Sequence, residues 1–353
     1  MTVSVFDHPF LSGLLGDEEV ADFFSAKADI DAMLAFEMAL AEAEAAEGVI
    51  PKEAGEAIAA ALKGFTPDIA DLRDGTRRDG LPVPALVKQL CKRVGEPHSE
   101  SVHFGATSQD LIDTSMALRL VGLLGILGRR IDALVAELDA LTARDGDIEV
   151  MGHTRMQAAI PVPAARKIAS WRDPLARHSQ RLEAVEKEIG ILHFGGAAGT
   201  LDKLGDKAGR VTERLAERLG LTAMPRARHC ERDAQAGLAS WLSLVTGSLG
   251  KMGQDIALMA QSEMGEIRLA SGGGSSAMPH KQNPIGAEML VTLARFNATL
   301  LSGMHQSLVH ENERSGAAWT LEWMLLPQMA VATGAALRTA AALLDGLAFV
   351  KRG

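Results

Sequence analysis

The chain has 353 residues, of which 47% are hydrophobic, so it is long enough for two or three ordinary domains with a sizeable core. Its formal net charge of −9 argues against nucleic acid as the main partner, because phosphate binding normally needs a basic surface. The longest apolar run, residues 120–128, is too short to span a bilayer, and no basic and apolar secretory signal opens the sequence. We therefore expect a cytoplasmic globular protein that binds neither nucleic acid nor membranes.

The cysteines and histidines give no sign of a metal site. Cys91 and Cys230 lie far apart and match no metal or redox spacing, so we expect two free thiols. Among the ten histidines no pair has the HExxH spacing or a related one. The sequence therefore predicts an activity without a metal.

The first hundred residues predict a small N-terminal domain of helices, residues 1–100. Apolar residues recur at helical spacing from residue 17 to 48, where Gly48 and Pro51 end the pattern, so we expect one long helix there. Shorter helices are expected at residues 52–62 and 84–94, with the polar segment 71–80 between them.

Five much longer helical patterns follow, and helices of such length usually pack side by side. They cover residues 108–144, 163–193, 231–270, 284–309 and 318–347. Pro174 lies inside the second and can kink it. Few segments have a period of two, so we predict an all-α fold in which residues 101–347 form a five-helix bundle domain.

Several of these helices are apolar around most of their circumference, as in residues 118–127 and 236–249. Such a helix must be buried on more than one side, which a monomeric bundle does not achieve. We therefore predict a homo-oligomer with helices packed between subunits. The alternative is a monomer whose alanines and glycines allow tight packing.

Three polar segments interrupt this helical pattern. In the first, residues 103–114, Thr107 and Asp110 have the spacing of a capping box at the start of the first long helix. A helix start with the adjacent hydroxyls of Thr107 and Ser108 is also a good carboxylate site, and the two interpretations are compatible.

The second segment, residues 152–163, is expected to be a loop between the first two long helices. Arg155 can grip a carboxylate through two parallel hydrogen bonds, and a histidine such as His153 can exchange a proton near neutral pH. A structural role for His153 is an equally good interpretation.

The third segment, residues 272–284, begins with three glycines and carries hydroxyl, imidazole, amine and amide groups. Backbone N–H groups of such a loop can converge on an anion, Lys281 adds positive charge, and Asn283 with Pro284 predicts a helix start. A flexible, solvated connection between helices is the alternative. The order of residues does not fit a phosphate-binding P-loop.

Taken together, residues 107–110, 152–157 and 274–284 resemble the three signature regions of the fumarase/aspartase superfamily, in the same order. The resemblance implies a homotetramer around a twenty-helix core, with five long helices from each subunit. It also implies no cofactor, and active sites assembled from three subunits that make or break a bond β to a carboxylate.

Within the superfamily, residues 5–7 with 24–25, 81–90, 194–200 and 311–319 look most like the cycloisomerases of the carboxylated muconates. Their reaction adds one carboxylate of a tricarboxylate substrate to a double bond and closes a lactone through an aci-carboxylate intermediate. The fumarate-releasing adenylosuccinate lyases resemble the chain less, since they typically carry a His-Asp-Val motif where this chain has residues 80–84. A lyase that releases fumarate and a non-catalytic helical scaffold remain the alternatives.

The resemblance also implies the roles of individual residues. Ser275 would transfer the proton, Lys281 and Asn283 would hold the activated carboxylate, and Glu288 would orient His153. The other residues expected to bind substrate are Thr107, Ser108, Thr154, Arg155, Gln157, Ser276, Met278 and Arg314. Trp319 is a weaker candidate, for which a place in the core is the alternative. The usual C-terminal domain of the superfamily is expected to be absent or vestigial, at residues 348–353.

Overall fold

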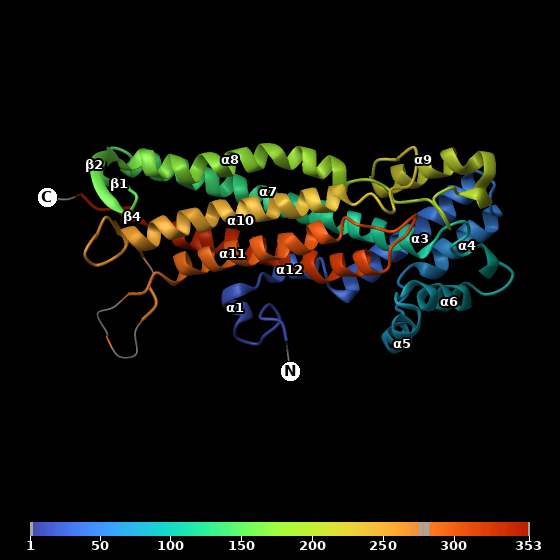
Figure 1. The fold of residues 1–353 in the computed structure, drawn as a ribbon. Coiled ribbons are helices and arrows are strands. Elements are labelled where there is room, and N and C mark those ends of the chain that lie inside the picture. Colours follow the sequence, from blue (N-terminus) through green and yellow to red (C-terminus); the bar gives the residue numbers. More distant parts are fainter. Residues whose placement is uncertain (1–2, 271, 275–277, 279–281, 352–353) are drawn as a thin grey trace.

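A computed structural model describes residues 3–270, 272–274, 278 and 282–351. These residues form an elongated bundle of long helices with a smaller group of helices at one end and a β-hairpin at the other (Figure 1). Two small two-stranded sheets account for all the strands of the described chain. The predicted all-α fold is confirmed.

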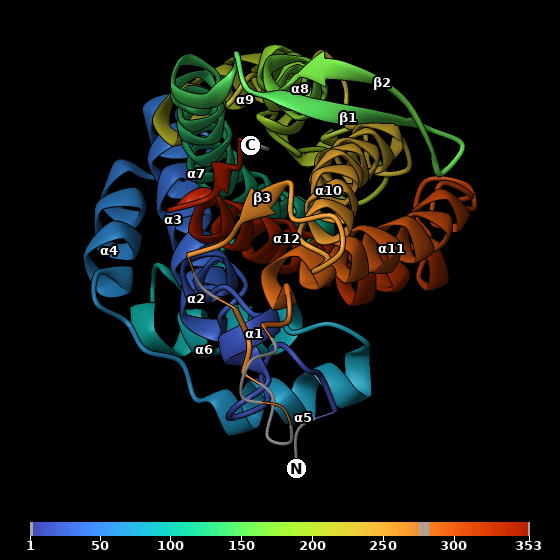
Figure 2. The same ribbon diagram turned by 90° about the vertical axis from the view of Figure 1, so that its left-hand side faces the viewer.

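The five predicted long helices are present and run along the bundle. They are α7 (Ser108–Asp145), α8 (Ala164–Ile189), α10 (Asp233–Met259), α11 (Ile285–Gln306) and α12 (Ala317–Leu344). Viewed along the bundle, α12 lies among α7, α10 and α11, and it packs against all three (Figure 2). Pro174 does not interrupt α8. The prediction was wrong for the end of α10, which stops at Met259 because the chain turns there, with Gly265 at a positive φ of 55°.

The N-terminal region contains more breaks than predicted. Its helices are α1 (Ser12–Leu15), α2 (Glu18–Asp22), α3 (Ala26–Ala46), α4 (Lys52–Leu62), α5 (Ile69–Asp79) and α6 (Val83–Val94), followed by the 3₁₀ turn η1 (Ser99–Ser101). The single helix expected from residue 17 is wrong, because the Ser25 side chain accepts the Ala28 N–H and begins a new helix. The polar segment expected between helices is itself α5, capped by Asp68 and ended by Gly80 at φ 78°.

The remaining elements connect the long helices. They are the hairpin strands β1 (Glu149–Thr154) and β2 (Gln157–Pro163), the turn η2 (Asp202–Lys207), helix α9 (Ala208–Leu219), and the paired strands β3 (Ile267–Arg268) and β4 (Ala348–Phe349). The loop expected at residues 152–163 is therefore wrong: β-branched and alanine residues there pair across a tight turn. Helix α9 was not predicted.

Buried side chains form two clusters. The larger one fills the bundle and includes Leu124, Trp171, Leu242 and Met329. The smaller one joins α3, α4 and α6 to α9 and to the first turns of α7. The division of the chain near residue 100 stays a prediction.

The bundle leaves some large apolar side chains on its surface. Val121, Leu244, Ile285 and Met324 are each more than a third exposed, on four of the five long helices. Helix α7 is long and apolar enough to cross a membrane by composition, but 61% of its most apolar window is buried inside the structure. That degree of burial is typical of a core helix of a soluble protein.

Glu44 is a buried acid in α3. Its burial predicts that the free energy of unfolding of the protein depends on pH. Its side chain is fully buried, and within the described chain neither carboxylate oxygen has a hydrogen-bond partner. Burial, helped by the nearby negative charge of Glu37, raises the pKa of Glu44 from 4.5 to about 9. Between these two values the folded protein keeps a proton that the unfolded chain releases. The free energy of unfolding therefore falls as the pH rises from 4.5 towards 9, by up to about 1.4 kcal/mol per pH unit.

We expect Glu44→Gln to remove this dependence, because an amide does not titrate. Urea unfolding of the wild type and of the variant should give free energies of unfolding whose difference grows in favour of the variant between pH 5 and pH 8. Glu53→Gln, at an exposed position in the first turn of α4, is the matched control. Parallel pH profiles for the wild type and Glu44→Gln would show that Glu44 is ionised in the folded protein.

Candidate active site

The predicted site residues lie at opposite ends of the bundle. Thr107 and Ser108 stand at the start of α7, whereas His153, Thr154 and Arg155 lie in the hairpin that follows its end. Helix α7 has 38 residues, so these two groups are separated by about 57 Å along its axis. One chain therefore does not bring the first and second segments together (Figure 1). We call the two groups the α7 end and the hairpin end.

At the α7 end the predicted capping box is confirmed. Thr107 is the N-cap residue of α7, and the Asp110 carboxylate accepts the backbone N–H of Thr107 at 2.9 Å. Asp110 is fully buried and also accepts the N–H groups of Gly195 and Gly196, at 2.8 and 2.9 Å. Its Oδ1 lies 2.7 Å from His229 Nε2. Asp110 thus fixes the helix start to the glycine segment that follows α8.

Arg314, which lies far from α7 in the sequence and shortly before α12, also contacts the α7 end. Its Nε donates to the Gln109 side chain at 2.9 Å, and its Nη2 donates to the carbonyls of Gly196 and Ala197. The side chain also lines a hollow of about 820 Å³ together with Leu81. The structure therefore brings together residues 81, 109, 196 and 314, which lie far apart in the sequence.

A buried cluster of charged side chains, which was not predicted from the sequence, lies at the α7 end. Arg232 lies between Asp113 and Glu322, with N–O distances of 2.7 Å to Asp113 and 2.9 Å to Glu322. Burial alone would raise the pKa of Asp113, but the Arg232 charge outweighs it and lowers that pKa to about 2. Trp319 donates to the same carboxylate and is only 3% exposed, so it is a core residue here. Polar residues at positions 109, 110, 113 and 114, on one face of the first turns of α7, were the available signal.

The hairpin end presents His153 and Arg155 on a bulged, tightly turned ribbon. Met151 pairs with Pro161 and His153 with Ala158, so the register shifts between them: Ala159 and Ile160 of β2 lie opposite the single residue Gly152 of β1. The two turn residues, Arg155 and Met156, both have positive φ, of 48° and 67°. This conformation costs a residue with a side chain about 1 kcal/mol or more, and such strain is common at functional sites.

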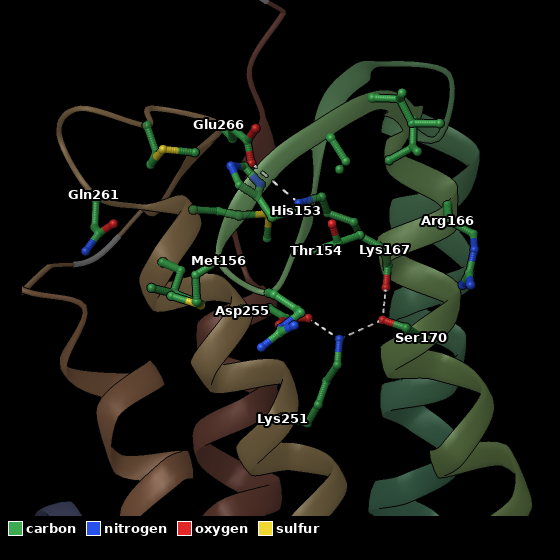
Figure 3. Close-up of a pocket in the computed structure, with 18 residues that line it drawn as sticks. His153, Thr154, Met156, Arg166, Lys167, Ser170, Lys251, Asp255, Gln261 and Glu266 are labelled. Carbon is green, nitrogen blue, oxygen red and sulfur yellow. Dashed lines mark hydrogen bonds and ion pairs between the residues drawn. The ribbon is translucent and has the colours of Figure 1, made fainter.

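A cavity of about 670 Å³ lies between this hairpin, α8 and the end of α10 (Figure 3). His153, Thr154 and Arg155 contribute to its wall, and so do the cationic side chains of Arg166 and Lys251. Lys251 is held in place by Asp255 and by the Ser170 hydroxyl, 2.9 Å away. Gln157 is exposed in β2 and is not among the lining residues. The cationic side chains and the imidazole of His153 suit a carboxylate ligand.

The glycine loop follows β3, which pairs with β4 at the hairpin end (Figure 1). Ser275, Ser276 and Lys281 lie outside the described residues. Gly273 and Asn283 pair through two 2.9 Å backbone hydrogen bonds at the base of the loop, and Met278 is 43% exposed. A side chain at position 273 would collide with Ile285, so close packing also favours glycine there. The predicted N-cap at Asn283 is wrong: α11 begins at Ile285 with Pro284 as its N-cap, because Asn283 is extended in that pairing.

Glu288 lies in the exposed first turn of α11. It is not among the residues that line the hairpin cavity, and no hydrogen bond joins it to His153 in the described chain. The described chain therefore does not show the predicted pairing of Glu288 with His153, which stays a prediction.

Comparison with known proteins agrees with these observations. A family model described as lyase matches residues 15–300. The 3-carboxy-cis,cis-muconate cycloisomerase of Pseudomonas aeruginosa is 39% identical over 330 residues, which are 92% of this chain and 72% of that protein.

Two solved structures have the same fold. The 3-carboxy-cis,cis-muconate lactonizing enzyme of Pseudomonas putida has a TM-score of 0.91 at 37% identity, covering 97% of this chain and 78% of that one. A fumarate lyase of Mesorhizobium has a TM-score of 0.89 at 34% identity, covering 95% of this chain and 76% of that one.

Proposed function

Since this chain belongs to the lyase family of the fumarase/aspartase superfamily, we propose that it is a cycloisomerase that converts 3-carboxy-cis,cis-muconate to 4-carboxymuconolactone. The observation that carries the proposal is the similarity to proteins named for this reaction, which extends over more than nine-tenths of the chain in sequence and in fold. The free thiols of Cys91 and Cys230 are consistent with a place in the reducing cytoplasm.

The proposed reaction is an addition to a double bond. A substrate carboxylate oxygen bonds to the carbon that bears the 3-carboxyl group, and the double-bond electrons move into the neighbouring carboxylate as an enediolate. The carbon next to the new bond then takes up one proton, which restores that carboxylate. The protein must therefore hold three carboxylates, stabilise one of them as it gains charge, and deliver one proton.

We assign these tasks to the residues of the three segments. Ser275 donates the proton, and Lys281 with Asn283 stabilises the enediolate. Arg155, Thr154 and Gln157 bind a carboxylate from the hairpin, as Thr107 and Ser108 do from the helix start. The attacking group is already ionised, so His153 needs only to bind and align the substrate. Arg314 acts by fixing Gln109 beside Ser108.

We propose that the site is shared between subunits of a homotetramer. The separation of about 57 Å between Ser108 and the hairpin supports this, because one substrate cannot touch both ends of one chain. The exposed apolar side chains of the long helices, and Met156 and Ile160 on the hairpin at 72% and 68% exposure, supply surface for such contacts. Light scattering tests the assembly, and a monomeric mass would contradict it.

Steady-state kinetics with 3-carboxy-cis,cis-muconate tests the function. We expect the absorbance of the conjugated diene to disappear with saturation kinetics, and NMR to identify the lactone as the product. The same protein should release no fumarate from succinyl-substituted amines or thioethers. Fumarate release without lactone formation would make the chain a lyase, and inactivity towards all these substrates would favour a scaffold.

A further inference from the structure

We propose that Glu266 is a positioning residue, whose buried carboxylate fixes the hairpin strand that carries His153 and so sets the orientation of the His153 ring. The inference rests on the proposed function, because it concerns the site residue His153. Glu266 lies in the segment between α10 and β3, more than a hundred residues after His153 in the sequence. Its side chain is buried, with only 1% of the residue exposed.

The carboxylate holds the hairpin by its backbone. Glu266 Oε1 accepts the N–H of Met151 at 3.0 Å, and the carbonyl oxygen of Met151 lies 3.2 Å from His153 Nδ1. A carbonyl oxygen only accepts, so Nδ1 must carry the proton in this contact, which leaves Nε2 as the nitrogen available to a substrate. Met151 therefore connects the Glu266 carboxylate to both the position and the tautomer of the His153 ring.

The irregular pairing beside Met151 gives this attachment a structural reason. Opposite Gly152 the extra residue of β2 interrupts the regular pairing, so strand pairing alone does not fix the direction of the His153 side chain. The Met151 N–H that Glu266 accepts belongs to the residue directly before Gly152. An anchor at Met151 limits how Gly152 and His153, which follow it in β1, can rotate.

Glu266 is itself held from several sides. Its N–H donates to the Met259 carbonyl at the end of α10, and its carbonyl accepts the N–H of Val350 after β4. Lys167 Nζ of α8 lies 3.6 Å from Oε2, which has no hydrogen-bond partner among the described residues (Figure 3). The anchor is thus rigid. Glu266 also stands directly before β3, after which the chain continues to the glycine loop.

Kinetics of a double-mutant cycle tests whether Glu266 acts through His153. We expect Glu266→Ala to lower kcat/KM about tenfold, and Glu266→Gln, which keeps an acceptor oxygen for Met151, to restore most of it. In a His153→Ala background, Glu266→Ala should have almost no further effect. The same tenfold loss in that background would show a merely structural role and overturn the proposal. Glu263→Ala, at an exposed position in the same segment, is the matched control.

Hydrogen–deuterium exchange of peptides covering residues 149–157 separates this inference from the proposed function, since it needs no substrate. Uptake should rise in Glu266→Ala and stay at the wild-type level in Glu266→Gln; unchanged uptake in both would overturn the anchor even in an active enzyme. If Glu266→Ala does not fold, Glu266→Asp takes its place. It keeps the charge but is one methylene too short to reach Met151, and we expect it to behave as Glu266→Ala.

Discussion

Ser275→Ala is expected to lower kcat about a thousandfold while the protein stays folded and oligomeric, because the proposed addition cannot finish without a positioned proton donor. KM should change little, since the carboxylates of the substrate are held mainly by cationic and amide groups. The measurement is the rate of diene loss at saturating 3-carboxy-cis,cis-muconate, with circular dichroism and light scattering to check the fold and the assembly.

Ser262→Ala provides the control for this variant. Ser262 is an exposed serine in the same connection between α10 and α11, so the substitution removes a hydroxyl without touching the signature segment. We expect wild-type turnover from it. Near-normal turnover in Ser275→Ala would remove that serine from the chemistry and leave the proton to another group.

The helices of the bundle could be predicted because the physics of each one is local. For α7 the prediction agrees with the observed ends to within one residue. It rests on apolar periodicity, on the capping box of Thr107 and Asp110, and on the absence of proline from the helix interior. The wrong predictions of helix starts occur where a single polar group determines the start. Ser25 begins a new helix through one hydrogen bond to Ala28, and Asn283 is drawn into a backbone pair with Gly273 instead of capping α11.

The hairpin could not be predicted from its composition. A two-residue turn normally needs Asn or Gly at positive φ, and this one uses Arg155 and Met156. Sequence rules penalise that choice, so the segment looked like a loop. The conflict between the local rule and the structure occurs at the arginine expected to bind substrate, where such conflicts are most common.

The site residues were found as motifs, but their supporting residues were not. Glu266 and Arg232 act through contacts to residues more than a hundred positions away, and no spacing in the sequence announces such a contact. The separation of Ser108 from His153 also becomes visible only in three dimensions. This separation supports a site shared between subunits on geometric grounds, in addition to the resemblance to the superfamily. The shared site can be tested directly.

Mixing two inactive variants should restore activity if the site draws on different chains. Ser108→Glu places a negative charge where a substrate carboxylate is expected, and an acidic residue in the first turn of a helix favours folding. We expect it to lower kcat/KM at least a hundredfold, by like-charge repulsion, while the neutral Ser108→Gln loses much less. Ser275→Ala supplies the second inactive chain, with an intact helix start.

In oligomers formed from equal amounts of the two chains, half of the sites take their helix start from a Ser275→Ala chain, and half of those take their loop from a Ser108→Glu chain. Roughly a quarter of wild-type activity should therefore return in a closed symmetric assembly. Co-expression with two affinity tags and sequential purification isolates the mixed oligomers, and their turnover is compared with that of each variant alone. If mixed oligomers are recovered and remain as inactive as the parents, the helix start and the glycine loop do not meet across subunits. The shared site would then be wrong, although each segment could still bind substrate by itself.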